Sequence, residues 1–421
     1  MHRRKQEIFI VNSTPPFDEK SNFEHLSQAE RRVAEHDAFE ARALAGQGRL
    51  NGFKFDREYA SAARDTEPHV SSPRPESRPI IRPLVVRFAA FGDVVMLTAL
   101  IDALQQRYAA PIDLLSSGPW TPALLANDHA VGEIQLVTSR KTPYWLCPSQ
   151  WRAVRWMATR RDVPVYLCDP EPQALALLLR AGIPRENILR AWDTWPGNQA
   201  HWVDWWNDVA RQTPEAFAKS APRASEFTTS PRLFVSDVER ADCDAWLRDL
   251  AIASSPLVLL QPGNKRTLKH GKSVQTDNKY WTPENWAQLV AAIMQDMPDA
   301  RVLLCGADAE RPPLEEIVAA CNNPAVINLA GALPINRLLP LMQRAHSMVS
   351  IDTGPAHAAA ALACPLVVLF GAMGSTRWRP RSPGSPVIAL ESDRGEASKV
   401  MDIAPEQVIA AWRSLPAIAM R

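Results

Sequence analysis

From residue 84 onward, short apolar runs alternate with longer amphipathic stretches. The runs LVVRFAA, IDLLSS, IQLVT, VPVYLCD and NILRAWD have the length of strands, while intervening segments such as VVMLTALIDALQQRY and SQWRAVRWMATRR have helical periodicity. Strand–helix alternation at this spacing is typical of right-handed βαβ units. The pattern therefore predicts a parallel sheet in this part of the chain.

A second alternation begins after a polar stretch at 211–231. Its strand-like runs are PLVLLQPG, ARVLLCG, AVINLAG, SMVSIDTG, LVVLFGA and VIALES, again separated by helical segments. We expect two doubly wound α/β domains, at 81–245 and 246–421. Residues 1–80 are polar, charged and rich in Pro and Ser in places, so we expect a poorly ordered N-terminal extension there.

Composition limits the class of protein. The 421 residues hold 47 Lys and Arg against 46 Asp and Glu, a net charge of +1, which argues against a general nucleic-acid binder. The six cysteines form no CxxC pair, which fits free thiols in a reducing cytoplasm. No apolar run reaches the ~18–20 residues of a membrane-spanning helix. We therefore expect a cytoplasmic protein.

One turn combines several backbone constraints. In SIDTGPAHAAAAL, at 350–362, a strand runs into Asp-Thr-Gly-Pro and then into a helix of small residues. Gly354 suggests a backbone shape that other residues avoid, and Pro355 suits a first helical turn. The free amides of such a helix start form an anion site. The alternative is an ordinary strand–turn–helix capped by Asp352 or Thr353.

Three motifs together resemble glycosyltransferase family 9, the heptosyltransferases. VSIDTGPAHAAAALACPLVVLFGAMGSTRW is similar to the family's C-terminal D-T-G-x-x-H signature, RFAAFGDVVMLTALIDAL to its N-terminal G-D motif, and NKYWTPENWAQL to its K-x-W-P stretch. LPINRLLPLMQRA resembles the helix before D-T-G. The motifs occur in the family's order, and the resemblance covers roughly residues 82–415.

The resemblance implies a GT-B fold, in which two Rossmann-like domains face each other across a cleft. It implies an N-terminal acceptor-binding domain and a C-terminal domain for the nucleotide-sugar donor. The implied reaction inverts the anomeric centre and needs no metal or other cofactor. The expected donor is ADP-heptose, and the expected acceptor is a glycan or lipid-linked glycan such as the lipopolysaccharide inner core. Such an acceptor would suit peripheral contact with the inner membrane surface.

The resemblance also assigns roles to individual residues. It makes Asp93 the general base, although the position alone favours a helix N-cap. Lys279, otherwise a solvated loop lysine, would neutralise charge on the departing diphosphate. The resemblance places His357, which would otherwise be structural, at the donor. The backbone amides implied at the diphosphate are those of Asp352, Thr353, Gly354 and Ala356. Pro355, between the last two, has no amide hydrogen to offer.

Other candidates surround the nucleoside end of the donor. Glu310 matches the family acid that binds ribose hydroxyls, with Asp308 as a rival two positions away. Leu333 matches a residue against the adenine ring. A run of basic residues after a strand end would attract phosphates at the mouth of a cleft, or would simply be a solvated face. It holds Lys265, Arg266, Lys269, His270 and Lys272.

Several other patterns have structural explanations. The D-x-D at Asp242 and Asp244 lies in a helical pattern, where residues two apart point to different faces, so we interpret it as surface charge rather than a metal site. No G-x-G-x-x-G follows a strand and no P-loop is present. Five of the 14 tryptophans cluster at 192–206. Core packing accounts for most of them; the alternative for one of them is contact with the acceptor.

Two alternatives to a heptosyltransferase stay open at this point. One is a GT-B transferase with another nucleotide-sugar donor or another acceptor. The other is a degenerate member that only binds glycans. The presence of Asp93 and Lys279 argues against the second alternative.

Overall fold

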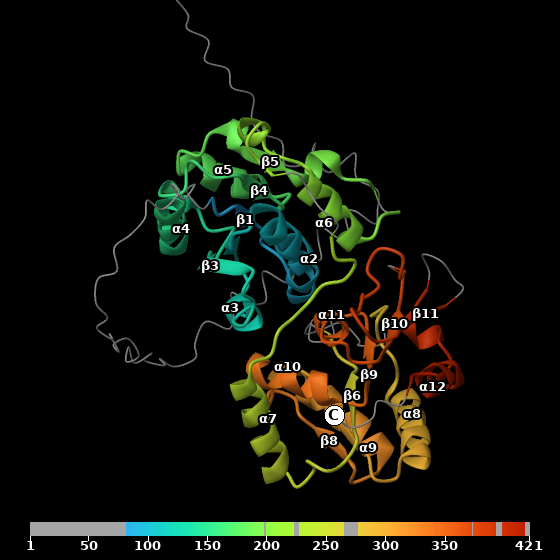
Figure 1. The fold of residues 1–421 in the computed structure, drawn as a ribbon. Helices are drawn as coiled ribbons and strands as arrows, with labels where there is room; N and C mark the ends of the chain where they lie inside the picture. The colour runs from blue at the N-terminus through green and yellow to red at the C-terminus, as the bar shows by residue number, and fades with distance from the viewer. Residues whose placement is uncertain are drawn as a thin grey trace, which may run out of the picture.

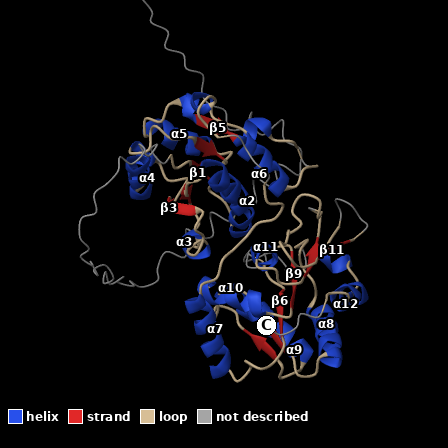
Figure 2. Ribbon diagram, viewed as in Figure 1, coloured by secondary structure: helices blue, strands red, loops and turns tan. Residues whose placement is uncertain are grey.

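Two parallel β-sheets form the framework of the molecule (Figure 1; Figure 2). The computed structural model describes residues 81–197, 199–222, 227–264, 277–372, 374–392 and 398–416. The expected N-terminal extension, 1–80, lies outside these residues. The first sheet has the order β3-β2-β1-β4-β5 and the second β11-β10-β9-β6-β7-β8. All described strand pairs are parallel, as the alternating pattern predicted.

The strands coincide with the apolar runs of the sequence. They are β1 (Leu84–Val86), β2 (Ile112–Ser116), β3 (Val131–Leu136), β4 (Val165–Leu167), β5 (Ile188–Arg190), β6 (Leu257–Gln261), β7 (Arg301–Leu304), β8 (Val326–Asn328), β9 (Ser347–Ile351), β10 (Leu366–Phe370) and β11 (Val387–Glu391).

The helices follow the strands in the expected alternation. They are α2 (Phe91–Tyr108), α3 (Thr121–Leu124), α4 (Pro148–Ala158), α5 (Pro172–Arg180), α6 (Trp202–Arg211), α7 (Asp237–Asp249), α8 (Pro283–Asp296), α9 (Arg311–Cys321), α10 (Ile335–Arg344), α11 (Gly354–Ala361) and α12 (Pro405–Arg413). Short 3₁₀ segments occur at η2 (Tyr144–Leu146), η3 (Arg185–Asn187), η4 (Ala191–Thr194), η5 (Glu215–Phe217), η7 (Asp308–Glu310) and η9 (Val400–Asp402).

Successive strand residues pack on opposite faces of each sheet. In β1, Leu84 and Val86 join a core with α4 and α5, while Val85 faces α2 and α6. In β6, Val258 packs in the core that contains α8, α9 and α12, while Leu259 faces α7, α10 and α11. Buried parallel strands need apolar side chains on both faces, which explains why their sequences are continuous apolar runs.

A single hydrophobic cluster joins the two sheets. It contains the face of the first sheet covered by α2 and α6 and the face of the second covered by α10 and α11. The two halves therefore meet over an apolar surface, where α2 lies against α11 (Figure 1). Burial of this surface favours a fixed arrangement of the halves.

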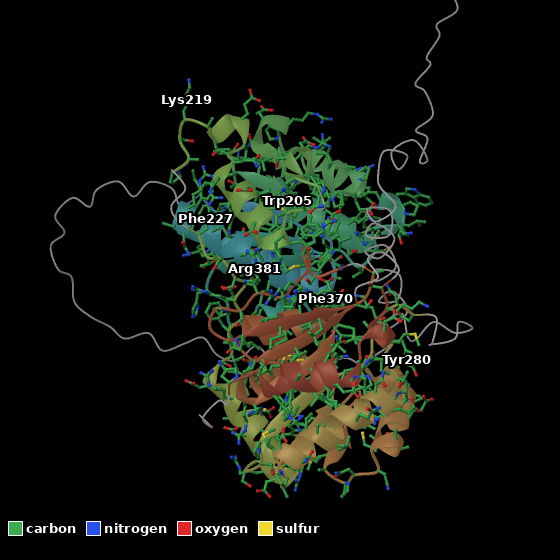
Figure 3. All side chains as sticks on the ribbon, turned by 90° about the vertical axis from the view of Figure 1, so that its right-hand side faces the viewer. Trp205, Lys219, Phe227, Tyr280, Phe370 and Arg381 are labelled. Carbon is green, nitrogen blue, oxygen red and sulfur yellow. The ribbon has the colours of Figure 1, made fainter. Side chains whose placement is uncertain are left out.

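Polar contacts reinforce the same junction from the loop after β10. The two terminal guanidinium nitrogens of Arg381 donate to the carboxylate of Asp204 on α6, at 2.5 and 2.6 Å. The ring of His201 donates to the carbonyl of Arg379 at 2.7 Å. Figure 3 shows Arg381 where the two halves of the molecule meet. The loop thus holds the start of α6 against the second sheet.

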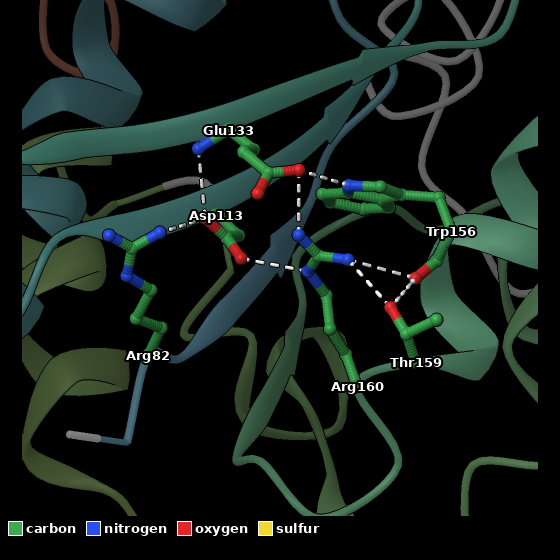
Figure 4. A network of polar contacts seen from close by, with 6 residues as sticks. All are labelled: Arg82, Asp113, Glu133, Trp156, Thr159 and Arg160. Carbon is green, nitrogen blue, oxygen red and sulfur yellow. Dashed lines mark hydrogen bonds and ion pairs between the residues drawn. The ribbon is translucent and has the colours of Figure 1, made fainter. Parts of the chain in front are cut away.

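A polar network fixes the end of α4 to the amino ends of β2 and β3 (Figure 4). Arg160 contacts the carboxylate of Asp113 at 2.8 Å and that of Glu133 at 2.7 Å, and its guanidinium lies 4.1 Å from the ring centre of Trp156. Asp113 also accepts from the amide of Glu133 and lies 4.0 Å from Arg82. Asp113 is almost fully buried, so its charge depends on these partners.

We predict that Arg160→Met lowers the free energy of unfolding by about 2 kcal/mol, the scale for losing a hydrogen bond to a buried charge. Methionine is similar in length but removes the cation, together with its hydrogen bonds to the Trp156 carbonyl and the Thr159 hydroxyl. Arg211, whose pair with Asp208 is exposed, is the matched control; Arg211→Met should change stability by less than about 0.5 kcal/mol. Denaturant unfolding followed by fluorescence measures both. Equal effects of the two substitutions would contradict the importance of the buried pair.

Candidate active site

The strand orders place the sequence candidates at the two points where the winding of each sheet reverses. β1 lies between β2 and β4, and β6 lies between β9 and β7. Ligands of open parallel sheets bind beyond the carboxyl ends of the strands at such points. Asp93 follows β1, and the Asp352 turn follows β9. The two turns come from different domains and meet at the junction of α2 and α11.

Asp93 lies inside α2 and does not cap it. Ala90 precedes the helix, and Asp93 is the third helical residue, so the N-cap interpretation of this aspartate is wrong. Its carboxylate is mostly buried and lies 3.9 Å from the guanidinium of Arg87 at the end of β1. Arg87 also donates to the carbonyl of Cys168 at 3.2 Å and lies 5.5 Å from the ring centre of Trp202. The acid therefore faces a fixed cation.

Lys279 and Asp352 form a buried pair. The ammonium of Lys279 lies 2.8 Å from the Asp352 carboxylate and donates to the Asp352 carbonyl at 2.7 Å. Both side chains are largely buried. The structure thus brings together two residues that were singled out in separate motifs. It also shows that Lys279 is held against the turn, so the alternative interpretation of a solvated loop lysine is wrong.

The backbone of the Asp352 turn differs from expectation in two ways. The amide of Asp352 donates to the carbonyl of Leu369 at 3.0 Å, so it belongs to the sheet ladder and is not available to a phosphate. Gly354 is the first residue of α11 and does not have a positive φ, so the expected special backbone shape is wrong. In the described part of the chain, the amides of Thr353 and Gly354 have no hydrogen-bond acceptor. These two amides are the ones left for an anion.

Glycine is needed at 354 because the start of α11 lies very close to the start of α2. A Cβ atom there would lie 2.9 Å from the Phe91 ring and 3.0 Å from the amide nitrogen of Gly92. A Cβ at Gly92 would in turn lie 2.9 Å from the His357 ring and 3.1 Å from the Cα of Gly354. The first turns of α2 and α11 are therefore in backbone contact. Both turns carry the positive end of a helix dipole, so their partial charges add at one place.

The side chain of Thr353 also departs from ordinary capping. Thr353 is the N-cap residue of α11, but its side chain makes no capping hydrogen bond. Its hydroxyl instead donates to the carbonyl of Ile351 at 3.3 Å and lies 3.2 Å from the hydroxyl of Ser350. The helix start is thus left without the side-chain acceptor that normally satisfies its amides.

Two buried histidines line the junction. Burial is the largest cause of a shift that lowers the pKa of His357 from 6.5 to about 4; Asp352 opposes this shift, and His201 and Lys279 add to it. Burial also lowers the pKa of His201 to about 4. The Nδ1 atom of His201 accepts from the amide of Val203, so Nε2 carries the proton donated to Arg379. Both rings are neutral at pH 7.

The candidates for the nucleoside end lie at the same edge of the second sheet. Glu310 is buried, and burial raises the pKa of its carboxyl. Its Oε2 accepts from the amide of Ala307 at 2.7 Å, while Oε1 faces Gly263 after β6 and has no partner among the described residues. The rival Asp308 is exposed and pairs with Arg311 at 3.4 Å. Leu333, after β8, is half-buried against the core.

The remaining sequence candidates are structural or lie outside the described residues. The basic run from Lys265 to Lys272 falls in 265–276, outside them. Asp242 and Asp244 pair with Arg337 and Arg344, both on α10, at 3.0 and 2.9 Å. The expectation that they point to different faces is therefore wrong, since both reach α10, but both side chains remain partly exposed as surface charge. Within the described ranges, no group of three or more His, Cys, Asp or Glu could hold a metal.

The tryptophans pack together with residues that the sequence analysis missed. Trp202, Trp205 and Trp206 are buried, and Trp192 and Trp195 pack against them. From the other half, Trp378 lies 5.1 Å from Trp202, centre to centre, and the buried guanidinium of Arg377 lies 4.3 Å from the ring centre of Trp195. The chain brings these residues together only on folding, so no local pattern identified Arg377.

A second acid after a strand was also missed. Asp169 follows β4, the neighbour of β1, and its carboxylate accepts from the amides of Phe88 at 2.7 Å and Glu171 at 3.0 Å. Burial raises its pKa, against the lowering effect of Arg87 and Arg140. The run VYLCD, which ends in an acid at a strand end as SID does, was the available signal.

Comparison with known proteins gives a consistent result. Residues 195–406 match the model of glycosyltransferase family 9 (heptosyltransferase). Lipopolysaccharide heptosyltransferase 3 of Escherichia coli (strain K12) is 31% identical over 304 residues, 69% of this chain and 82% of that protein. Lipopolysaccharide heptosyltransferase 2 of Salmonella typhimurium is 23% identical over 367 residues, 79% of this chain and 97% of that protein.

Solved structures share the architecture. The Escherichia coli ADP-heptose lipopolysaccharide heptosyltransferase II superposes with a TM-score of 0.61 at 21% identity, over 79% of this chain and 98% of that one. A family 9 glycosyl transferase from Veillonella parvula gives 0.63 at 14% identity, over 79% of this chain and 96% of that one. The fold is therefore GT-B, as the resemblance implied.

The buried histidines predict how stability changes with pH. Their pKa values lie near 4 in the folded chain and near 6.5 when unfolded, so the unfolded chain binds protons first as the pH falls. The free energy of unfolding should be highest above about pH 6.5 and should fall towards pH 4. His357→Gln should reduce this fall. Thermal melts of both proteins between pH 7 and pH 5 measure it, and an unchanged slope in the variant would contradict a neutral buried His357.

Proposed function

Since the chain belongs to glycosyltransferase family 9, the heptosyltransferases, we propose that it transfers a heptose from ADP-heptose to the inner core of lipopolysaccharide. The chain is a glycosyltransferase; the donor, the acceptor, inversion and metal independence are the proposal. The observation that carries it is the backbone contact between the starts of α2 and α11, at Gly92 and Gly354. This contact puts Asp93 of one domain near a turn of the other domain whose amides would bind an anion.

The donor would bind through the second domain, 246–421. Its diphosphate would accept from the amides of Thr353 and Gly354, with the ammonium of Lys279 beside them. Glu310 would accept from the ribose hydroxyls, because its Oε1 has no other partner in the described chain and a buried unpaired acceptor is costly. Leu333 would lie against the adenine. A solved complex of Escherichia coli heptosyltransferase WaaC contains ADP, which supports this nucleotide.

The acceptor would bind through the first domain, 81–245, with Asp93 as general base. Its carboxylate would take the proton of the acceptor hydroxyl, and that oxygen would attack the anomeric carbon of the heptose. The bond from the anomeric carbon to the diphosphate would break, with inversion. Arg87, 3.9 Å from Asp93, places a positive charge beside the carboxylate that would accept this proton.

Charge on the departing diphosphate would be stabilised at the second turn. Lys279 already lies against Asp352 at 2.8 Å, so its position is fixed before the donor arrives. A preorganised cation needs no rearrangement in the transition state, where the negative charge grows. His357, neutral and packed on Gly92, would position the turn and donate at most a hydrogen bond to the donor.

The location of the reaction follows from the proposed acceptor. Proteins named lipopolysaccharide heptosyltransferase are among the relatives, and lipopolysaccharide is a lipid-linked glycan. We propose that the chain works in the cytoplasm at the surface of the inner membrane. No cofactor beyond the donor enters the proposed reaction.

We predict that Asp93→Asn lowers heptose transfer by about 10²–10⁴-fold, the usual contribution of a general base, while ADP still binds. Asp102→Asn, the same change farther along α2, is the matched control and should leave the rate near wild type. Transfer is measured with ADP-heptose and a lipopolysaccharide inner-core acceptor, with and without excess chelator. Parallel assays replace ADP-heptose with other nucleotide-sugars.

Three results would contradict the proposal. A near wild-type rate for Asp93→Asn would remove the general base. Loss of activity in chelator, restored by magnesium, would contradict a metal-independent reaction. Faster transfer from another nucleotide-sugar would replace ADP-heptose as the donor.

A further inference from the structure

Three large apolar side chains are exposed at one corner of the first domain. Trp145 and Leu146 of η2 are 69% and 54% exposed, and Trp151 on α4 is 39% exposed. The indole nitrogen of Trp151 donates to the carbonyl of Tyr144 at 2.6 Å, so the helix and the 3₁₀ segment present these side chains side by side. Clustered exposed aromatic side chains usually mark a binding surface.

The polar side chains of the same segment point inward. Ser149 and Gln150 are buried, and the Ser149 hydroxyl accepts from the amide of Thr138 at 3.0 Å. The Gln150 amide donates to the carbonyls of Ser139 at 2.9 Å and Thr142 at 3.0 Å. These hydrogen bonds hold the loop 138–142, which precedes η2, against buried side chains of α4. Trp145 and Leu146 are therefore left on the solvent side of the segment.

Cations surround the apolar side chains. The segment 138–161 contains Arg140, Lys141, Arg152, Arg155, Arg160 and Arg161, and no Asp or Glu, in a chain whose net charge is only +1. Lys141, Arg152 and Arg155 are exposed, and Arg152 and Arg155 lie beside Trp151 on the outer face of α4. The guanidinium of Arg180 on α5 lies 4.9 Å from the Tyr144 ring centre and extends the basic border.

We propose that this surface, formed by Trp145, Leu146, Trp151, Lys141, Arg152 and Arg155, binds the anionic phospholipid face of a bilayer. Tryptophan prefers the boundary between headgroups and acyl chains, and exposed cations are attracted to anionic headgroups. The combination of outward apolar side chains with a border of one charge sign matches that chemistry. No helix within the described ranges has the length and apolar character needed to cross a bilayer, so contact would be peripheral.

The surface is connected to the acceptor side of the active site. The segment begins after the carboxyl end of β3, and Arg140 donates to the carbonyl of Phe88 at 3.1 Å, just before the turn that leads to Asp93. Bilayer contact would therefore hold Asp93 near the membrane surface. This positioning of Asp93 rests on the proposed function, because it would bring the general base close to an acceptor only if that acceptor is anchored in the membrane.

The test is sedimentation of the full chain with vesicles. We expect binding to vesicles of equal parts phosphatidylcholine and phosphatidylglycerol, weaker binding at high salt, and little binding to phosphatidylcholine alone. Trp145→Ser combined with Leu146→Ser should weaken binding by about tenfold or more. Arg152→Ser combined with Arg155→Ser should weaken it by about 25-fold, since each cation contributes about fivefold.

The matched control is Val238→Ser combined with Leu250→Ser, which removes two exposed apolar side chains from the region of α7. This variant should bind vesicles like wild type. Absence of wild-type binding to the anionic vesicles would overturn the proposal. Equal binding by wild type and both surface variants would also overturn it, because binding would then belong to another segment. The same would follow if the control variant lost as much vesicle binding as the surface variants.

Turnover separates this inference from the proposed function. On a detergent-dispersed acceptor, the surface variants should transfer heptose at the wild-type rate, because none of the substituted residues contacts Asp93 or the Asp352 turn. If wild type binds the vesicles through this surface but transfers no heptose, the proposed function fails and the membrane surface stands.

Discussion

The close approach of two helix starts is the constraint on which the site depends. Gly92 and Gly354 allow the backbones of α2 and α11 to touch, and a Cβ at either position would lie about 3 Å or less from an atom of the other helix. Helix starts carry partial positive charge, so their approach is unfavourable unless anions or carboxylates lie nearby. Asp93 and Asp352 supply the carboxylates, and a bound diphosphate would supply the anion.

The apolar junction supports this approach. The hydrophobic cluster runs continuously from the α2 and α6 face of one sheet to the α10 and α11 face of the other, and Arg381 and His201 add polar contacts at its border. The cost of bringing two positive helix ends together is thus offset by burial elsewhere. Each of these two acids has a cation beside it, Arg87 at 3.9 Å from Asp93 and Lys279 at 2.8 Å from Asp352.

Local patterns predicted the fold and the position of the turns. Apolar runs identified the strands, and strand–helix alternation implied parallel sheets whose carboxyl ends collect functional residues. The Asp352 turn could be named from its own consecutive residues, whereas the position of Asp93 alone favoured a helix cap and only the resemblance of its Gly-Asp motif suggested a catalytic role. Glu310 and Leu333 could be named only through the family resemblance, and their roles remain proposals.

Contacts between distant segments could not be predicted in the same way. The pair between Lys279 and Asp352 joins residues 73 positions apart, and Arg377 reaches the tryptophans of the other domain. Gly354 was explained by backbone freedom, because its sequence neighbours suggest a turn; the actual reason, contact with Phe91 and Gly92, exists only in the folded chain. The same limit affected Asp242 and Asp244, whose partners lie on α10.

The most direct test of the account is calorimetric titration of ADP into Gly354→Val. A branched side chain at 354 would force the starts of α2 and α11 apart and displace the amides of Thr353 and Gly354. Gly384→Val is the matched control, since the nearest atom to a Cβ there is 4.0 Å away. The account predicts that Gly354→Val loses at least about tenfold in ADP affinity, the equivalent of one good hydrogen bond, while Gly384→Val binds like wild type. Wild-type ADP affinity in a folded Gly354→Val protein would contradict a diphosphate site at this turn.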